Sequence, residues 1–498
     1  MFDNLLSLAI WVPIIAGVLV LATGSDQRAG LARILAFIGS LAGFLVTLPL
    51  FTRFDRLSGG YQFTEFHSWI PVLNINYALG VDGISVLFII LNAFITLMVV
   101  LAGWEVIQKR PAQYMAAFLI MSGLINGAFA AQDAILFYVF FEGMLIPLYL
   151  IIGMWGGPRR VYASVKLFLY TLLGSLLMLV AMVYLSYQAG GSFSIVDFQN
   201  LKQIPLGVQQ LLFIAFFLSF AVKVPMWPVH TWLPDAHVEA PTGGSMVLAA
   251  ITLKVGAYGF LRFILPILPD ASRYFAPVII VLSLIAVIYI GMVALVQTDM
   301  KKLVAYSSIS HMGFVTLGLF LFSGGYLNDW ALKGAIIQMI SHGFVSAAMF
   351  MCIGVMYDRL HTRNIADYGG VVNVMPKFAA FMMLFGMANA GLPATSGFVG
   401  EFMVIMGAVE VNFWVGALAA LTLIYGASYT LWMYKRVIFG PITNPEVKEM
   451  KDINCREFAI LAILAIAVLG MGLYPQAFIE VVHQAANDLI THVAQSKI

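Results

Sequence analysis

Four charged side chains lie within stretches that are otherwise apolar: Glu142, Lys223, Lys254 and Glu401. An ionisable group at membrane depth costs at least about 2.5–3.5 kcal/mol, so it persists mainly where it carries ions or protons. A lysine beside a carboxylate can hold or release a proton as the two groups approach or separate. These residue types therefore favour proton transport through the interior of a membrane protein.

Each of the four charges also has a structural interpretation. Glu142 could be held by Tyr138, one turn earlier, or stay protonated. Lys223 could extend towards the membrane surface from a helix end, and Glu401 could lie near the surface because a loop-like segment precedes it. Lys254 fits such an interpretation least, since it lies in the middle of its apolar stretch among small residues. We interpret Lys223 as the proton switch, Glu142 as its partner and Lys254 as the next acceptor.

Histidine could connect such sites because its side chain titrates near neutrality. His230, His311 and His342 fall in or near apolar stretches and are candidates for the same relay, although a lone helical histidine is as often a packing residue. The five remaining histidines are interpreted as loop or terminal residues: His67, His237, His361, His483 and His492.

The elements that must position these side chains are membrane helices. The chain has 498 residues, 61% hydrophobic and 10% charged, with a mean hydropathy of +0.94, whereas soluble domains carry about 25% charged residues. Each crossing needs roughly 20 apolar residues. We predict an all-α membrane protein with about 14 transmembrane helices, the first of which, Leu5 to Ala22, is expected to be retained rather than removed as a signal. The predicted segments begin near residues 4, 31, 84, 114, 134, 164, 209, 242, 275, 301, 332, 377, 414 and 457.

Several classes of function have no support in the sequence. The two cysteines, Cys352 and Cys455, are too few for an iron–sulfur cluster or a structural zinc site held by thiolates alone. A net charge of +2 gives no case for nucleic acid as a partner, and neither a P-loop nor a dinucleotide-binding glycine motif is present. We therefore expect no cofactor or metal on this chain, and any redox chemistry on another chain.

The basic residues predict an orientation. When the predicted loops are assigned to alternate sides, one side collects about 17 of the 26 lysines and arginines, including Lys301, and the other about seven, including Arg262. The richer side faces the cytoplasm or the mitochondrial matrix by the positive-inside rule. Both termini are then expected on the opposite side.

Prolines interrupt two of the predicted helices. Pro225 and Pro228 deprive the carbonyls of Ala221 and Val224 of their helical donors, and Pro393 does the same for Asn389. Paired broken helices are typical of inverted-repeat transporters with ion sites near the midplane. Segments 4–8 and 9–13 are therefore predicted to be two five-helix repeats, in which segments 7 and 12 are broken. The corresponding division of the chain is 1–113, 114–265, 266–436 and 437–498.

Four motifs extend this interpretation, at residues 141–156, 221–241, 305–313 and 391–402. They resemble the antiporter-like proton-pumping subunits of respiratory complex I, and the resemblance covers nearly the whole chain. It implies a fourteen-helix subunit that translocates protons while NADH:quinone electron transfer proceeds on other subunits, which carry FMN, iron–sulfur clusters and quinone. The implied partners are the other membrane subunits, chiefly the two other antiporter-like subunits, together with the lipid bilayer.

The resemblance also implies roles for individual residues. Glu142 matches the glutamate of helix 5, Lys223 the lysine of broken helix 7, Lys254 the lysine of helix 8 and Glu401 the outlet glutamate of helix 12. His230 and His342 match positions along the polar axis, and His311 lies in the matching helix-10 motif. The implied location is the bacterial inner membrane with both termini periplasmic, or the mitochondrial inner membrane if the chain is organellar.

Three alternatives remain. Large subunits of multi-subunit cation/proton antiporters and of membrane-bound hydrogenases share the Trp-Leu-Pro-Asp motif at 232–235. Helix 12 in those families and in the two other antiporter-like subunits usually carries lysine, whereas position 401 is glutamate. The chain also ends about twenty residues after segment 14, which leaves no room for the lateral helix of the largest antiporter-like subunit. Both points favour the remaining antiporter-like subunit of complex I over the two other such subunits and over the antiporter and hydrogenase families. A passive membrane scaffold would tolerate neutralisation of the four charges.

Overall fold

The computed structural model describes residues 4–24 and 26–498. Among these residues, twelve helical stretches are long and apolar enough to cross a membrane. Two of the fourteen predicted segments are not among them. Helix α15 (Met300–Leu319) is less apolar because it carries two lysines, a histidine and several serines, and the segment near 377 is divided into two shorter helices. The chain is thus a multi-pass membrane protein.

The N-terminal part contains three membrane helices and a β-hairpin. The all-α prediction was wrong for residues 62–81, which form two antiparallel strands paired from Gln62 with Val81 to Ile70 with Ile75. The buried side chain of β1 is Glu65, whose carboxylate accepts the amides of Leu6 and Ser7 at 2.8 and 3.1 Å and so fixes the hairpin to α1. The elements are α1 (Leu5–Ala22), α2 (Ala29–Thr52), β1 (Gln62–Ile70), β2 (Ile75–Val81) and α3 (Val86–Val106).

The next part holds the first proline-interrupted helix and a helix with two π-helical turns. The elements are α4 (Pro111–Ala130), α5 (Ala134–Gly143), α6 (Leu145–Trp155), α7 (Arg160–Gln188), α8 (Ile195–Asn200), α9 (Leu206–Lys223), α10 (Trp232–Glu239), α11 (Thr242–Val247), η3 (Leu248–Thr252), α12 (Leu253–Gly259), η4 (Phe260–Ile264) and α13 (Leu265–Ile267). The last five of these elements are continuous from Thr242 to Ile267.

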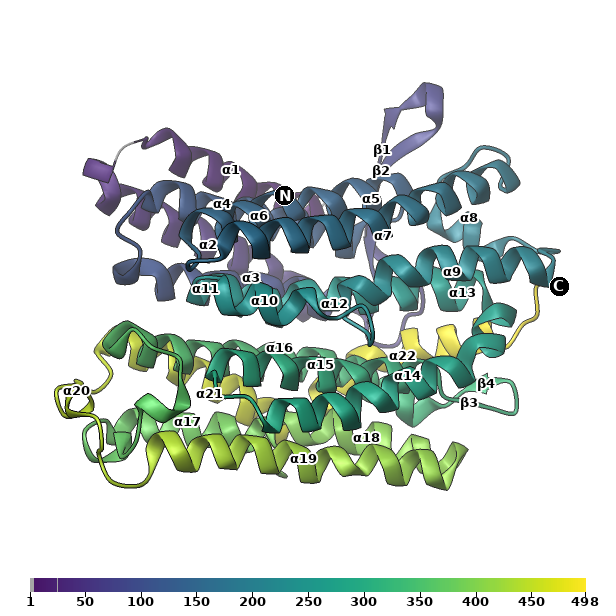
Figure 1. Cartoon of the computed structure of the whole chain (residues 1–498). Helices are drawn as coiled ribbons and strands as arrows, with labels where there is room; N and C mark the ends of the chain where they lie inside the picture. The colour runs from purple at the N-terminus through teal and green to yellow at the C-terminus, as the bar shows by residue number, and fades with distance from the viewer. Residues whose placement is uncertain (1–3, 25) are drawn as a thin grey trace.

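The remaining elements form the other side of the bundle, as the colour gradient in Figure 1 shows. They are α14 (Pro269–Leu295), α15, β3 (Phe322–Ser323), β4 (Tyr326–Leu327), α16 (Asp329–Leu360), α17 (Pro376–Asn389), α18 (Ser396–Val411), α19 (Phe413–Ile438), α20 (Pro445–Lys448), α21 (Cys455–Leu473) and α22 (Gln476–Val493). His483 and His492, interpreted from sequence as loop or terminal residues, lie in helix α22.

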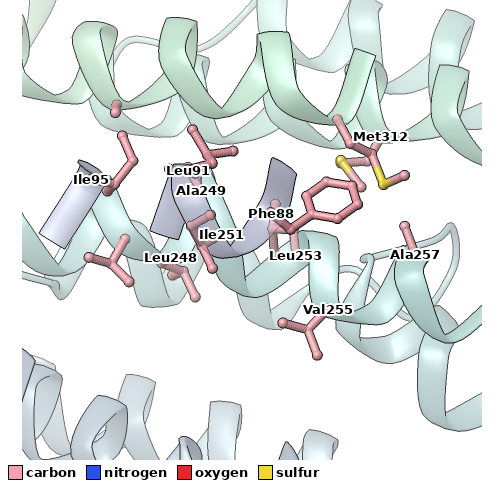
Figure 2. Close-up of a cluster of buried hydrophobic side chains, with 14 of the residues drawn as sticks. Phe88, Leu91, Ile95, Leu248, Ala249, Ile251, Leu253, Val255, Ala257 and Met312 are labelled. Atoms are coloured by element: carbon pink, nitrogen blue, oxygen red, sulfur yellow. The ribbon is translucent and has the colours of Figure 1, made fainter. Parts of the chain in front are cut away.

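Two helices form the buried centre of the bundle. The most apolar part of the stretch Thr242–Ile267 is entirely buried and that of α16 is 94% buried, whereas α2 and α19 are only 33% buried. Figure 2 shows Phe88, Leu91 and Ile95 of α3 beside side chains of η3 and α12, with Met312 of α15 on the same cluster. Polar residues on η3, α12, α15 and α16 therefore lie away from lipid.

The C-terminal helix α22 leads the end of the chain back to the middle of the sequence. It packs against α16 and then leads the chain end back to the first half. The Ile204 amide donates to the Lys497 carbonyl at 2.8 Å, and the Lys497 amide donates to the Asp270 carboxylate at 2.9 Å. The last residues are thus fastened to α14 and to the loop before α9.

Candidate functional site: a buried proton relay

The first proline interruption exposes the end of a helix inside the protein. Helix α9 ends at Lys223, and α10 begins at Trp232. The Ala221 carbonyl, freed by Pro225, accepts the Met226 amide at 2.7 Å, and the Val222 carbonyl accepts the Trp232 indole at 2.8 Å. These partners satisfy backbone groups that the prolines leave without helical donors.

A glycine brings the next membrane helix close to this end. A Cβ atom on Gly256 of α12 would lie 2.9 Å from both the Lys223 Cβ and the Val224 nitrogen. Such close approach is possible only without a side chain. Gly256 therefore lets α12, the helix that carries Lys254, pack directly against the end of α9.

Glu142 and Lys223 form the first part of the site. Lys223 is 1% exposed, and its Nζ lies 5.4 Å from the centre of the Phe141 ring. Within the described residues that Nζ has no hydrogen-bond partner. Glu142, at the end of α5, is half-buried and interacts with the Ser175 side chain and with the Lys223 charge. The two charges attract each other without being fixed in a direct hydrogen bond.

Lys254 and His342 form the second part. Lys254 is fully buried, and its Nζ lies 2.6 Å from the Nδ1 of His342 on α16. The ammonium also donates to the Ala249 carbonyl in the π-helical turn η3. π-Helical turns are frequent at functional sites. Two acceptors thus surround this buried ammonium group, which compensates for its removal from water.

His311 and Glu401 form the third part. The His311 Nδ1 on α15 lies 2.7 Å from a carboxylate oxygen of Glu401 on α18, and the Gln338 amide donates to the same oxygen at 3.2 Å. The ring centres of His311 and His342 are 5.6 Å apart. Each ring uses Nδ1 for its partner, and in the described structure each Nε2 has none. Lys254, His342, His311 and Glu401 therefore form one buried polar row across four helices.

His230 does not join this row. It lies in the connection between α9 and α10, is 8% exposed, and has an unpartnered Nδ1 as far as the described residues show. Its nearest charge is Lys166 of α7, which pairs with Asp235 at 2.7 Å. His230 thus belongs to a separate polar group near that ion pair.

Sequence reasoning missed His237. It was interpreted as a loop residue, but it lies in α10, fully buried, with its ring stacked on Phe350 at 4.4 Å between centres. Neither ring nitrogen has a partner in the part of the chain that the structure describes, and its charged neighbours are Lys301 and Lys254. An eight-residue helix is too short for apolar periodicity to reveal it. The only local signal is its position between Pro234 and Pro241.

Two basic residues assigned to loops from the sequence are also buried. Lys301, at the start of α15, is 5% exposed and donates to the Ala240 carbonyl at 2.6 Å. Arg262 lies in the π-helical turn η4 and pairs with Asp82 at the root of the hairpin. Among residues 4–24 and 26–498, no group of three histidine, cysteine or acidic side chains is arranged to hold a metal ion.

The chain as a whole is similar to known proteins. The sequence profile described as "NADH:quinone oxidoreductase/Mrp antiporter, TM" matches residues 131–425, and the profile "NADH-ubiquinone oxidoreductase chain 4, amino terminus" matches residues 59–129. NADH-quinone oxidoreductase subunit M of Rhodobacter capsulatus is 48% identical over 98% of this chain and 96% of that protein. NADH-ubiquinone oxidoreductase chain 4 of Marchantia polymorpha is 43% identical over 99% of this chain and 98% of that protein.

A solved structure agrees with these relatives. A chain of respiratory complex I from Thermus thermophilus superposes with a TM-score of 0.89 at 30% identity, covering 98% of this chain and 99% of that one. Identity at this level over the full length confirms the resemblance that the four motifs indicated, and also the preference for one subunit type. The chain belongs to the family of NADH-quinone oxidoreductase subunit M and NADH-ubiquinone oxidoreductase chain 4.

Proposed function

We propose that the chain is the proton-translocating membrane-arm subunit of NADH-quinone oxidoreductase, and that it moves protons along the buried row described above. Electron transfer from NADH to quinone takes place on other subunits, which hold FMN and the iron–sulfur clusters. The observation that carries the proposal is the contact of Lys254 with His342 and of His311 with Glu401, all inside apolar helices. Charged groups at this depth mark proton pathways.

The order of proton transfer follows from the contacts. When Glu142 and Lys223 approach, the lysine keeps its proton, and when they separate it releases the proton towards Lys254. The Lys254 ammonium passes a proton to His342 Nδ1, and His342 releases the proton on its Nε2 towards the free Nε2 of His311. His311 then passes its Nδ1 proton to the Glu401 carboxylate, the outlet. A single water molecule between the two Nε2 atoms is enough to complete the path.

The arrangement of helices supports an inverted-repeat transporter with fourteen crossings. We assign α15 as one crossing and α17 with α18 as another, in addition to the twelve apolar stretches. The proposed repeats are residues 114–265 and 266–436, and each contains one interrupted helix: α9 with α10, and α17 with α18. A charged residue accompanies each interruption, Lys223 just before the first and Glu401 just after the second, as expected for ion sites near the midplane.

The proposed orientation follows the positive-inside rule. The end of the bundle that carries α20 in Figure 1 is proposed to be the basic one, which faces the cytoplasm or matrix. Both termini are proposed to lie on the other side. The proposed neighbours are the two other antiporter-like subunits, with which the row would be continuous at Glu142 and Glu401. His230 is proposed to serve the Lys166–Asp235 ion pair rather than the row itself.

The principal alternative is the large subunit of a cation/proton antiporter or of a membrane-bound hydrogenase. The profile that matches residues 131–425 covers both NADH:quinone oxidoreductases and Mrp antiporters. Full-length relatives at 48% and 43% identity are oxidoreductase subunits, and this favours the oxidoreductase.

The experiment is measurement of proton pumping and NADH-to-quinone turnover in membranes with Glu142→Gln, with assembly checked on a native gel. The control is Glu480→Gln, which removes a carboxylate that pairs with Arg56 on the surface, at 2.9 Å. We expect loss of both activities with Glu142→Gln in an assembled complex and little change with the control. Normal turnover with full pumping would leave Glu142 as a structural residue and would favour the passive scaffold.

A further inference from the structure

A second charged site lies on the outer surface, far from the buried row. Trp432, Lys435 and Arg436 occupy the last two turns of α19, the helix at the edge of the bundle in Figure 1. Trp432 is 48% exposed, and both cations lie over its ring, Lys435 with its Nζ at 5.8 Å and Arg436 with its Cζ at 5.1 Å from the ring centre. The three side chains form one cluster at the end of a membrane helix, where tryptophan and basic residues meet the lipid headgroups. We call them the α19 cluster.

Two grooves meet at the α19 cluster. The first, of about 640 Å³, runs along the membrane side between α19 and the end of α14 and is lined mainly by Leu295, Ala427 and Leu431. The second, of about 400 Å³, lies beyond the helix end and is lined by apolar side chains such as Ile365 and Phe439 together with Asn364 and Thr443. Trp432 and Lys435 line both grooves. An apolar groove that ends at two cations matches a molecule with an acyl chain and an anionic headgroup.

The charges of the α19 cluster are not compensated by the protein. Within the described residues, neither Lys435 nor Arg436 forms an ion pair, and one terminal nitrogen of Arg436 has no hydrogen-bond partner although it is buried. The nearby carboxylates are engaged elsewhere: Asp299 pairs with Arg363 at 3.4 Å, and Asp367 accepts from Thr362 at 2.6 Å. An anion is the missing partner. Arginine and lysine together bind phosphate well, arginine through its paired N–H groups and lysine as a point charge.

We propose that the α19 cluster binds an anionic phospholipid from the leaflet on the basic side of the protein. The phosphate contacts Lys435 and Arg436 where the two grooves meet, and an acyl chain lies along Leu295 and Leu431. Basic pockets beside membrane helices on this side favour anionic headgroups. The proposal is independent of proton transfer, because Lys435 and Arg436 lie in the last turn of α19, outside the buried row.

The experiment uses native mass spectrometry to count the phospholipids that remain bound to the detergent-washed complex. The unchanged protein is compared with Lys435→Gln/Arg436→Gln. The control is Lys448→Gln/Lys451→Gln, which removes two exposed lysines from the same side of the protein, outside both grooves. Titration with phosphatidylglycerol and phosphatidylcholine then gives the affinity for each headgroup. We expect about a 30-fold weaker affinity for phosphatidylglycerol after loss of the two charges, and no change in the control.

Trp432 supplies an independent readout that does not need both cations to be removed. A brominated phosphatidylglycerol should quench part of the tryptophan fluorescence, and Trp432→Phe should remove that part. Lys435→Gln alone should raise the lipid concentration needed for quenching by about fivefold. The proposal would be overturned if all variants retained the same amount of anionic lipid, or if the protein bound phosphatidylcholine as tightly as phosphatidylglycerol. Quenching that Trp432→Phe leaves unchanged would also overturn it. Protection of the cluster by a neighbouring protein subunit in the intact complex would overturn it as well.

Discussion

Gly256→Ala tests whether the close contact between α12 and the end of α9 sets the geometry of the relay. The added Cβ would lie 2.9 Å from the Lys223 Cβ and the Val224 nitrogen, and 3.1 Å from the Lys223 carbonyl carbon. Ordinary contacts between such atoms are about 3.5–4.0 Å, so the helices must separate by roughly 0.5–1 Å. Overpacking of this kind costs about 1–3 kcal/mol. The displaced atoms include the backbone of Lys223, so its ammonium group must move as well.

A displacement of 1 Å at a reacting group can slow its reaction by about 10²-fold. We therefore expect Gly256→Ala to assemble but to pump at least tenfold more slowly, as measured by NADH-driven acidification in membrane vesicles alongside a native gel. Gly470→Ala is the matched control, because Gly470 lies in helix α21 with open space around the position of a new Cβ. Its pumping should be unchanged. Assembled Gly256→Ala complex with full pumping would refute the view that this contact determines the position of Lys223.

Three further predictions follow from buried groups. His237→Phe keeps the stack on Phe350 but removes the ring nitrogens, so we expect normal assembly and at least tenfold slower pumping; unchanged pumping would make His237 a packing residue. Arg262→Gln leaves the Asp82 carboxylate buried without its cation, which should destabilise the protein by about 3–5 kcal/mol and lower its unfolding temperature; an unchanged temperature in differential scanning fluorimetry would contradict this. Burial lowers the pKa of Lys497 to about 8, and the nearby Asp270 opposes this shift. Because the unfolded lysine binds its proton up to about pH 10.4, stability should rise as the pH increases from 8 to 10. In Lys497→Met that rise should be smaller, and an identical pH profile would count against the assignment.

Apolar runs and their charged exceptions are local properties of a sequence, which is why the membrane class and the four embedded charges could be identified from it. The contacts within the row could not be predicted from the sequence in the same way, because Lys254 and His342 are 88 residues apart in the chain and meet only through helix packing. The Arg262–Asp82 pair spans 180 residues. Arg262 was assigned to a loop because a crossing of about 20 residues that begins near 242 ends close to that position, whereas the helical stretch continues to Ile267.

The hairpin and α22 were missed for a related reason. Both lie at the edge of the bundle, where one face is polar, so neither resembles a membrane-spanning segment. The profile match and the relatives identified the family, but they do not decide the roles of single histidines. His237 illustrates this point, because only the structure shows that it lies in a helix, α10, which follows α9 and precedes α11.

The fastening of the chain end has a mechanical consequence. Helix α22 runs from α21 along α16 and ends in hydrogen bonds that connect Lys497 with Ile204 and Asp270. Any rocking that parts the two proposed repeats at this end of the bundle must break those bonds or carry α22 with it. At the basic end of the protein the two repeats are joined as well, because Lys301 donates to the Ala240 carbonyl and Arg363 donates to the Val238 carbonyl. The repeats are therefore fastened at both ends, by the C-terminal residues at one end and by two basic side chains at the other, and any relative motion of the repeats must exchange these hydrogen bonds.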